Sequence, residues 1–200
     1  MFIFYICALI LIQTNQMNIE VKTVEELHKA LEKAKAGQTI QIYPGIYDFS
    51  TYQRSGKFYG TADGTKNSPI ILTAKDPNNP PLLTGPTLDH NYILHITGDY
   101  WIIENIRVGY SSKGIVLDNS NYSIIRKVEV FSTGEEAIHI RDGSSNCLVQ
   151  NVIFIILALE HQAMGRESIL VVLKALMNMA IIVIIMLLKD VFLKILLLRL

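Results

Sequence analysis

The chain lacks an excess of charge of either sign. Its 18 Lys and Arg residues balance 18 Asp and Glu residues over 200 positions, so the formal net charge is zero. No nucleic acid is expected as a partner, because nothing supplies the basic field that attracts a phosphate backbone. Only 2 cysteines are present, Cys7 and Cys147, and they lie in segments of very different composition. This pair does not imply a disulfide framework.

The signatures of several enzyme classes are also missing. The chain has no Walker phosphate loop, no zinc-ligand spacing, no nucleophile elbow and no catalytic triad arrangement. What it has is a composition that changes twice along its length. Residues 1–17 form an apolar leader, residues 18–151 are a balanced sequence with frequent Gly and Asn, and residues 152–200 are rich in Ile and Leu. These three segments are expected to have separate roles.

The leader, residues 1–17, has the length of a signal peptide. Its apolar run Phe2–Ile12 matches the hydrophobic region of a secretory signal and is too short to span a bilayer comfortably. No Lys or Arg precedes the run, and no clean cleavage site follows it. We expect a secretion signal and an extracellular location. An uncleaved membrane anchor or a misassigned start codon is the alternative.

The middle segment opens with one predicted helix. Thr23 and Glu26 fit a capping box, and apolar residues then recur at helical spacing up to Gly37, a favourable residue for ending a helix. The pattern predicts an amphipathic helix over residues 24–36. After it the period changes to two, and short apolar runs alternate with Gly, Asn, Asp and Ser up to Asn151. Many strands without crossover helices exclude a doubly wound α/β fold and leave a sandwich, a barrel or a solenoid.

An internal repeat decides among these architectures. Ser123 begins a run similar to the one at Trp101 (123 − 101 = 22), and Cys147 begins another (147 − 123 = 24). A fixed period of this length, read as two strands per unit, is typical of a β-solenoid whose coils stack on one another. Inward residues should then form aliphatic columns, for example Ile96, Leu117 and Ile140.

The segment VEELHKALEKAKAGQTIQIYPGIYDF resembles the opening of secreted right-handed parallel β-helix proteins of the pectin-lyase-like superfamily, in which a short helix plugs the end of the solenoid. GTADGTKNSPIILTAKDPNNPPLLTG is similar to the stretch that follows in those proteins, and ILHITGDYWIIENIRV to a coil of polysaccharide lyases of families six and nine. The resemblance covers about residues 21–151. It implies an all-β, right-handed parallel β-helix with an N-terminal capping α-helix over residues 18–151.

The resemblance also implies a function. Its members act on polysaccharides, and an acidic, uronate-containing polysaccharide is the expected partner. The reaction is β-elimination, in which a base takes the C5 proton while cations stabilise the anion that forms. In such lyases the proton-abstracting residue and the acidic calcium ligands lie on later coils, and no position here matches them. The residues themselves specify no cofactor, and Ca²⁺ is implied by the resemblance alone.

We therefore expect a fragment of a secreted carbohydrate-active β-helix protein that is inactive as written. Two alternatives stay open. One is a non-catalytic β-helix protein that binds glycans or serves a surface or adhesive role. The other is a membrane-anchored protein that contacts the membrane through its leader or its C-terminal tail.

The third segment, residues 152–200, departs from the repeat. Ile169–Leu188 is long enough to span a membrane, but Lys174 interrupts it. We prefer a one-base frameshift near codon 151, because Val152–Leu159 then decodes to Cys-Tyr-Phe-Tyr-Asn-Thr-Gly-Ile, a plausible end of a coil. The tail is expected to be a helical or disordered, non-native addition that leaves the solenoid uncapped and poorly stable.

Candidate carbohydrate-binding residues come from a loop and from outward positions. The loop Asp48–Lys66 carries aromatic and cationic side chains that suit an anionic polysaccharide, although loops also carry such residues without a role. Trp101 is a candidate to stack on a sugar ring, but it begins a strand with apolar neighbours, and partial packing is the simpler interpretation. His95 and His139 occupy equivalent places in their coils and should point outward; polar outward positions without a role are the simpler interpretation. The candidate set is Tyr52, Arg54, Tyr59, Trp101, His95 and His139.

Acidic residues in one turn form a candidate calcium site. Glu135, Glu136 and Asp142 carry the oxygen ligands that Ca²⁺ prefers, although paired acids in a turn are more often only solvated. Asp118 and Arg141 occupy equivalent places in neighbouring coils and are expected to form a solvated ion pair of small value for stability. No residue is assigned as catalytic.

Overall fold

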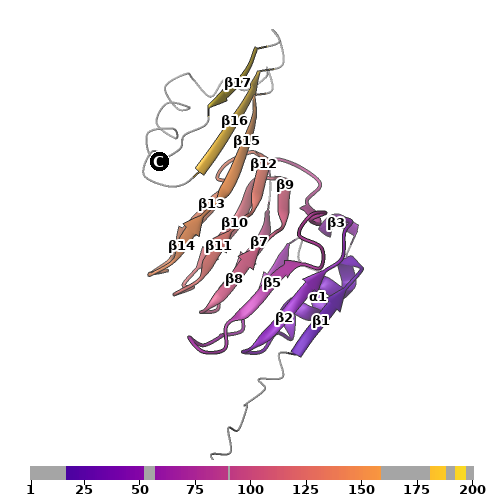
Figure 1. The fold of residues 1–200 in the computed structure, drawn as a ribbon, viewed down its shortest axis with the longest axis vertical. Coiled ribbons are helices and arrows are strands. Elements are labelled where there is room, and N and C mark those ends of the chain that lie inside the picture. The colour runs from indigo at the N-terminus through magenta and orange to yellow at the C-terminus, as the bar shows by residue number, and fades with distance from the viewer. Residues whose placement is uncertain (1–16, 52–56, 90, 159–180, 188–191, 197–200) are drawn as a thin grey trace, which may run out of the picture.

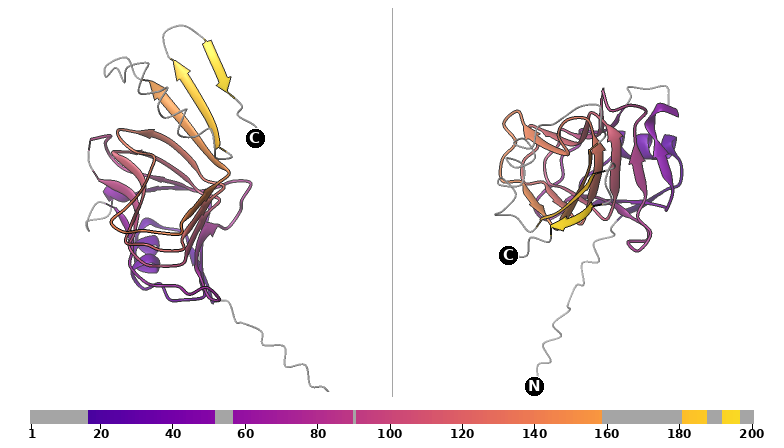
Figure 2. Two further views of the ribbon diagram at one scale, coloured as in Figure 1. Left: turned by 90° about the vertical axis from the view of Figure 1, so that its left-hand side faces the viewer. Right: turned by 90° about the horizontal axis from the view of Figure 1, so that it is seen from above.

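The computed structural model describes residues 17–51, 57–89, 91–158, 181–187 and 192–196. Its strands form three sheets that wind around a common axis, and the coils stack from the indigo N-terminal end to the orange strands (Figures 1 and 2). Every strand pair is parallel except β16 with β17. The predicted all-β parallel β-helix is confirmed.

The strands enter the sheets A, B and C in turn along the chain. Sheet A consists of β1 Met17–Val21, β2 Gln38–Ile42, β5 Ile70–Ala74, β8 Trp101–Glu104, β11 Ile124–Arg126 and β14 Leu148–Gln150. Sheet B consists of β3 Ile46–Asp48, β6 Leu82–Thr84, β9 Arg107–Ser111, β12 Glu129–Thr133, β15 Val152–Ala158, β16 Ile181–Leu187 and β17 Phe192–Leu196. Sheet C consists of β4 Phe58–Gly60, β7 Tyr92–Ile96, β10 Lys113–Asp118 and β13 Ile138–Arg141. A short 3₁₀ helix, Phe49–Thr51, follows β3.

Each coil therefore has three strands, and the two strands per coil expected from the sequence were wrong. The apolar run from Trp101 to Val108 is broken at Asn105, whose positive φ of 55° turns the chain from sheet A into sheet B. Lys127 and Asn151 turn the chain in the same way one and two coils later, with φ of 52° and 53°. A single residue in the left-handed region makes a corner without interrupting the apolar pattern, so the pattern alone does not reveal it.

One helix, α1 Val24–Glu32, covers the N-terminal end of the solenoid. The predicted capping box is present, because Thr23 accepts from the Glu26 backbone N–H and the Glu26 carboxylate accepts from the Thr23 N–H. The helix ends earlier than the expected residue 36. Lys33 forms the C-cap, and Ala34 is buried against the core, so Gly37 with its φ of 81° belongs to the turn before β2.

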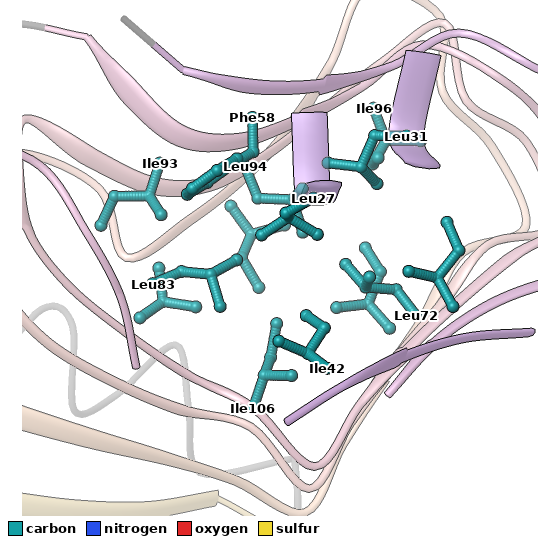
Figure 3. Packing of buried hydrophobic residues seen from close by; sticks show 14 of the residues in the cluster. Leu27, Leu31, Ile42, Phe58, Leu72, Leu83, Ile93, Leu94, Ile96 and Ile106 are labelled. Carbon is teal, nitrogen blue, oxygen red and sulfur yellow. The ribbon is translucent and has the colours of Figure 1, made fainter. Parts of the chain in front are cut away.

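Aliphatic columns fill the solenoid, as Figure 3 shows for part of the core. Leu27 and Leu31 of α1 point into it, against residues of the first coils. The predicted column is in register, because Leu117 pairs with both Ile96 and Ile140. Ile96 and Leu117 are fully buried, whereas Ile140, on the last described strand of sheet C, is 39% exposed. Each coil thus packs its inward side chains on the coil below and shields them from water.

The C-terminal segment differs from the expectation of a helical or disordered tail. Within the described residues it forms β15, β16 and β17, and β15 continues sheet B by pairing with β12. Val152 is fully buried and Phe154 packs on the core. The reason is that β-branched residues suit extended backbone and the edge of β12 offers free main-chain partners. No helix in the described ranges is long and apolar enough to cross a membrane.

Candidate functional site

The outer face of sheet C carries a cluster of polar and aromatic side chains. Along these strands Leu94, Ile115 and Ile138 point toward the core, and the following residues His95, Val116 and His139 lie on the opposite face. The sequence prediction that the two histidines share a face is consistent with this register. We call the following six residues the sheet C site: Lys57, Tyr59, Tyr92, His95, Asp118 and Arg141.

His95 lies at the centre of the sheet C site and is nearly buried. Its Nδ1 is 2.7 Å from the Lys57 Nζ, and its Nε2 is 2.7 Å from the Asp118 Oδ2. The rings of Tyr59 and Tyr92 flank the imidazole, with centroids 4.9 and 5.4 Å from that of His95. The predicted outward histidine is therefore covered by its neighbours rather than solvated.

Arg141 anchors the far side of the sheet C site. Its Nε and Nη2 donate to the two oxygens of Asp118 at 2.5 and 2.9 Å, and Nη2 also donates to the Tyr92 hydroxyl at 3.2 Å. The Asp118 side chain is only 12% exposed. The ion pair expected from the repeat is present, but Asp118 is shielded between two coils, so the expectation that it is solvated was wrong. A bidentate Arg–carboxylate contact in such surroundings holds both partners in one geometry.

The charges of the sheet C site follow from these contacts. The hydrogen bonds from Arg141 hold the pKa of Asp118 below its usual range, so Asp118 is ionised at neutral pH. Burial and the nearby Lys57 ammonium lower the pKa of His95, which keeps the imidazole neutral. Burial also lowers the pKa of Lys57. None of the ion pairs in the described part of the chain includes Lys57, whose Nζ contacts the His95 ring instead.

The candidate calcium site is not assembled. Glu135 and Glu136 both accept from the Lys113 ammonium, and Asp142 lies beside Arg141 with its Oδ2 3.9 Å from Nε. Among the described residues, no group of three or more His, Cys, Asp or Glu side chains is close enough to hold a metal ion. The three acids therefore do not fit Ca²⁺, because a lysine already neutralises the pair of glutamates. His139 contacts the same cluster, with Nδ1 3.7 Å from Glu136.

The other predicted sugar-binding residues fall into three groups. Trp101 is fully buried and donates its indole N–H to the Ala62 carbonyl at 2.7 Å, so its prediction as a sugar-stacking residue is wrong. Trp101 is the first residue of β8, and its side chain lies in the core. Tyr59 is 39% exposed and belongs to the sheet C site. Tyr52 and Arg54 lie outside the described residues.

The sequence pointed to Lys57 only as one cation of the loop Asp48–Lys66, and it gave no indication that Tyr92 lies beside His95. Lys57 directly precedes β4 and is brought to His95 by the stacking of β4 on β7, whereas Tyr92 begins β7, the strand that carries His95. The Lys57 ammonium lies 5.0 and 5.2 Å from the ring centroids of Tyr59 and Tyr92. The aromatic and cationic composition of the loop around Lys57 was the available signal. It did not indicate which coil the loop would contact.

Stacked parallel coils with a helical N-terminal cap define this protein as a parallel β-helix. The chain belongs to the family described as Pel9A-like, right handed beta helix region, whose model matches residues 13–154. A search of curated proteins gives no match.

The chain is similar to solved structures of polysaccharide lyases. The alginate lyase from Paenibacillus sp. str. FPU-7 is 28% identical, with a TM-score of 0.64 over 72% of this chain and 51% of that chain. A mannuronic acid specific polysaccharide family 6 lyase enzyme from human gut microbiota has a TM-score of 0.55 at 13% identity, over 72% of this chain and 38% of that chain, which bears on the fold alone. The chain spans about half the length of the Paenibacillus enzyme.

Proposed function

We propose that the chain acts as part of a secreted polysaccharide lyase-like protein that binds a uronate-containing polysaccharide on the outer face of sheet C. The observation that carries this proposal is the 28% identity with an alginate lyase over 72% of the chain. The reaction assigned to the whole protein is β-elimination at a uronate. The extracellular location rests on the apolar leader, residues 1–17.

The chemistry of the sheet C site supports an anionic sugar as the ligand. Lys57 supplies an amino group that forms no ion pair with a described carboxylate, and Tyr59 supplies a partly exposed ring beside it. A sugar presents an apolar face that stacks on aromatic rings, and a uronate adds a carboxylate that pairs with an ammonium. Binding should therefore need both groups and should weaken as salt is added.

The proposal is tested by titrating the full chain with oligomers of mannuronate, guluronate and galacturonate, and with a neutral glucan as the reference. We expect calorimetric binding of at least one uronate oligomer and none of the glucan. Tyr59→Ala should weaken that binding several-fold. Tyr122→Ala is the matched control, because Tyr122 is 49% exposed but stacks on Tyr100 away from the sheet C site. Equal weakening by the two variants, or equal binding of the glucan, would contradict the proposal.

A non-catalytic glycan-binding or adhesive protein is the second candidate. This candidate is favoured because the cations Arg141 and Lys113 already pair with carboxylates of the protein. Arg141 pairs with Asp118, and Lys113 pairs with Glu135 and Glu136. Elimination creates a double bond conjugated with the carboxylate, and this bond absorbs ultraviolet light. Binding without growth of that absorbance would favour the second candidate.

A further inference from the structure

We propose that the peptide bond between Asp142 and Gly143 is a site of spontaneous covalent modification, at which the aspartate isomerises to isoaspartate through a cyclic succinimide. Aspartate is followed by glycine twice in the chain, at Asp63 and at Asp142. A glycine in this position favours ring closure, because no side chain crowds the amide nitrogen that attacks the carboxyl group. The reaction needs only the chain and water, so it is independent of the proposed function.

Asp142 and Gly143 are the central residues of a tight turn directly after β13. The Ser144 N–H donates to the Arg141 carbonyl at 3.0 Å, which closes the turn. Both central residues have a positive φ, 51° for Asp142 and 83° for Gly143, as is typical of a type I′ turn. Both are exposed, and the Asp142 side chain is 68% exposed. The two reacting groups are therefore adjacent and open to water.

Few contacts restrain this turn. Within the described ranges, the Asp142 carboxylate has one ion-pair contact, with the Arg141 Nε 3.9 Å away, and the Gly143 N–H makes no hydrogen bond. The space beside the Gly143 Cα is open, because the nearest side-chain atom to the position of a Cβ is the Asn119 Oδ1 at 3.9 Å. β13 is the last described strand of sheet C, so no described coil covers the turn. The amide nitrogen is free to approach the carboxyl carbon.

The other aspartate-glycine pair is held in place by the following coil. The Gly64 N–H donates to the Asp99 carbonyl at 2.8 Å, and the Asp63 Oδ1 accepts from the Asp99 N–H at 2.9 Å. Gly64 is buried, and the Tyr100 carbonyl oxygen and the Ile70 nitrogen lie 2.7 and 2.9 Å from the position of a Cβ. Both reacting groups are engaged and the space beside them is filled. Asp63 is therefore expected to resist the reaction in the folded chain.

The atoms of the reaction balance with water as the only co-reactant. The Gly143 nitrogen forms a bond to the Asp142 carboxyl carbon, and the carboxyl OH leaves as water with the amide hydrogen. Water then adds to one of the two ring carbonyls. Addition at the side-chain carbonyl breaks the new bond to nitrogen and restores aspartate. Addition at the main-chain carbonyl breaks the original peptide bond and leaves isoaspartate, whose main chain runs through the side-chain methylene.

The product lengthens the turn by one methylene group next to Arg141. The hydrogen bond between the Ser144 N–H and the Arg141 carbonyl closes a turn of fixed length, so it cannot keep its geometry in the longer chain. Arg141 also holds the two oxygens of Asp118 at 2.5 and 2.9 Å. A displacement of Arg141 should loosen that contact, and we expect the isomerised chain to melt at a lower temperature.

Ageing of the full chain at constant temperature, followed by peptide mapping, tests the proposal. A glutamate-specific protease releases a peptide that begins at Ala137, and a methyltransferase specific for isoaspartate labels the product. We expect isoaspartate to form several-fold faster at Asp142 than at Asp63 in the folded chain. In guanidinium chloride the two rates should be similar, because neither pair is restrained. Equal rates in the folded chain, or modification of Asp142 only in the denaturant, would overturn the proposal.

Asp142→Glu is the blocking variant, and Asp63→Glu is the matched control. Glutamate would have to close a larger ring, which forms more slowly, so Asp142→Glu should lose the label from the peptide that begins at Ala137. Asp63→Glu should keep it. Label that persists in folded Asp142→Glu would place the isoaspartate elsewhere and refute the site. After ageing, the melting temperature should fall in the wild-type chain but not in Asp142→Glu. Equal melting of the two aged chains would refute the effect on Arg141.

Discussion

At the scale of single residues, the sheet C site depends on one shielded carboxylate. Asp118 receives two hydrogen bonds from Arg141 and contacts His95, and its side chain is 12% exposed. Such a charge is tolerated because its partners replace the water it loses. Removing one partner lowers the free energy of unfolding by more than the intact pair contributes to it. The reason is that the remaining ionised group is then buried without a partner.

Arg141→Met should therefore destabilise the protein. Two hydrogen bonds to a charged group are lost, and we expect a decrease of about 1–3 kcal/mol in the free energy of unfolding. Urea denaturation followed by circular dichroism measures it. Arg107→Met is the matched control, because Arg107 pairs with a more exposed carboxylate, Glu129, which is 25% exposed. The prediction fails if the control loses as much stability as Arg141→Met.

The buried histidines predict how stability depends on pH. Burial is the largest cause that lowers the pKa of both His28 and His95 from 6.5. The unfolded chain therefore binds more protons than the folded chain as pH falls below about 6.5, so stability should decrease there. Melting temperatures across a pH series measure this slope. His28→Gln and His95→Gln should each reduce the slope of melting temperature against pH. An unchanged slope in the double variant would show that the two histidines do not cause the pH dependence.

At the scale of elements, α1 begins where its capping box specifies. Thr23 and Glu26 satisfy backbone N–H groups that the first helical turn would leave without partners. Leu27 and Leu31 of this helix pack against the first coils, where both side chains are fully buried. It closes the N-terminal end of the core, so its stability is coupled to that of the solenoid.

Thr23→Ala should lower the free energy of unfolding by about 1 kcal/mol, the usual cost of losing an N-cap side chain. Thermal or urea unfolding of the full chain measures it. Thr61→Ala is the control, because Thr61 is also exposed but lies in a loop outside any helix. A loss of the same size at Thr61 would show that the effect is not due to the cap.

At the scale of the whole molecule, the two ends of the solenoid differ. The N-terminal end is covered by α1, whereas β13 and β14 are the last described strands of sheets C and A. Ile140 and Leu148 on these strands are 39% and 45% exposed. Apolar side chains on an open strand edge favour pairing between chains.

We predict that the 200-residue chain is poorly stable and associates through this end. Light scattering after size-exclusion chromatography should show a mass that rises with protein concentration. The double variant Ile140→Lys, Leu148→Lys should associate less, because it places charge on the edge. Ile46→Lys is the control at the opposite end, where Ile46 is 72% exposed. A monomeric chain with one cooperative melt would refute this prediction.

The frameshift expected near codon 151 is also a prediction for the whole chain. Resequencing the gene across this codon tests it directly. One additional base should restore Gly, Asn and Tyr to the residues after Val152 and continue the coil pattern. Genomic reads that confirm the frame as printed, together with relatives that share the Ile-rich tail, would reject it.

The sequence by itself determined the repeat, the capping helix and the inward columns. Periodicity and capping are local signals, because they arise from the pitch of a strand or helix and from hydrogen bonds between near neighbours. Leu117 pairs with Ile96 and Ile140 as its spacing predicted. The shared outer face of His95 and His139 followed from the same spacing.

Only the tertiary structure decided which side chains make the site. Lys57 and His95 are 38 positions apart, with β4, β5 and β6 between them, and no local sequence signal indicates their contact. Trp101 was a candidate sugar-stacking residue, but its side chain is fully buried in the core. Asp118 and Arg141 were placed in register by the repeat, yet their shielding comes from the side chains of other coils. A site on a solenoid face is assembled across coils, so its distances and charges exist only once the coils have stacked.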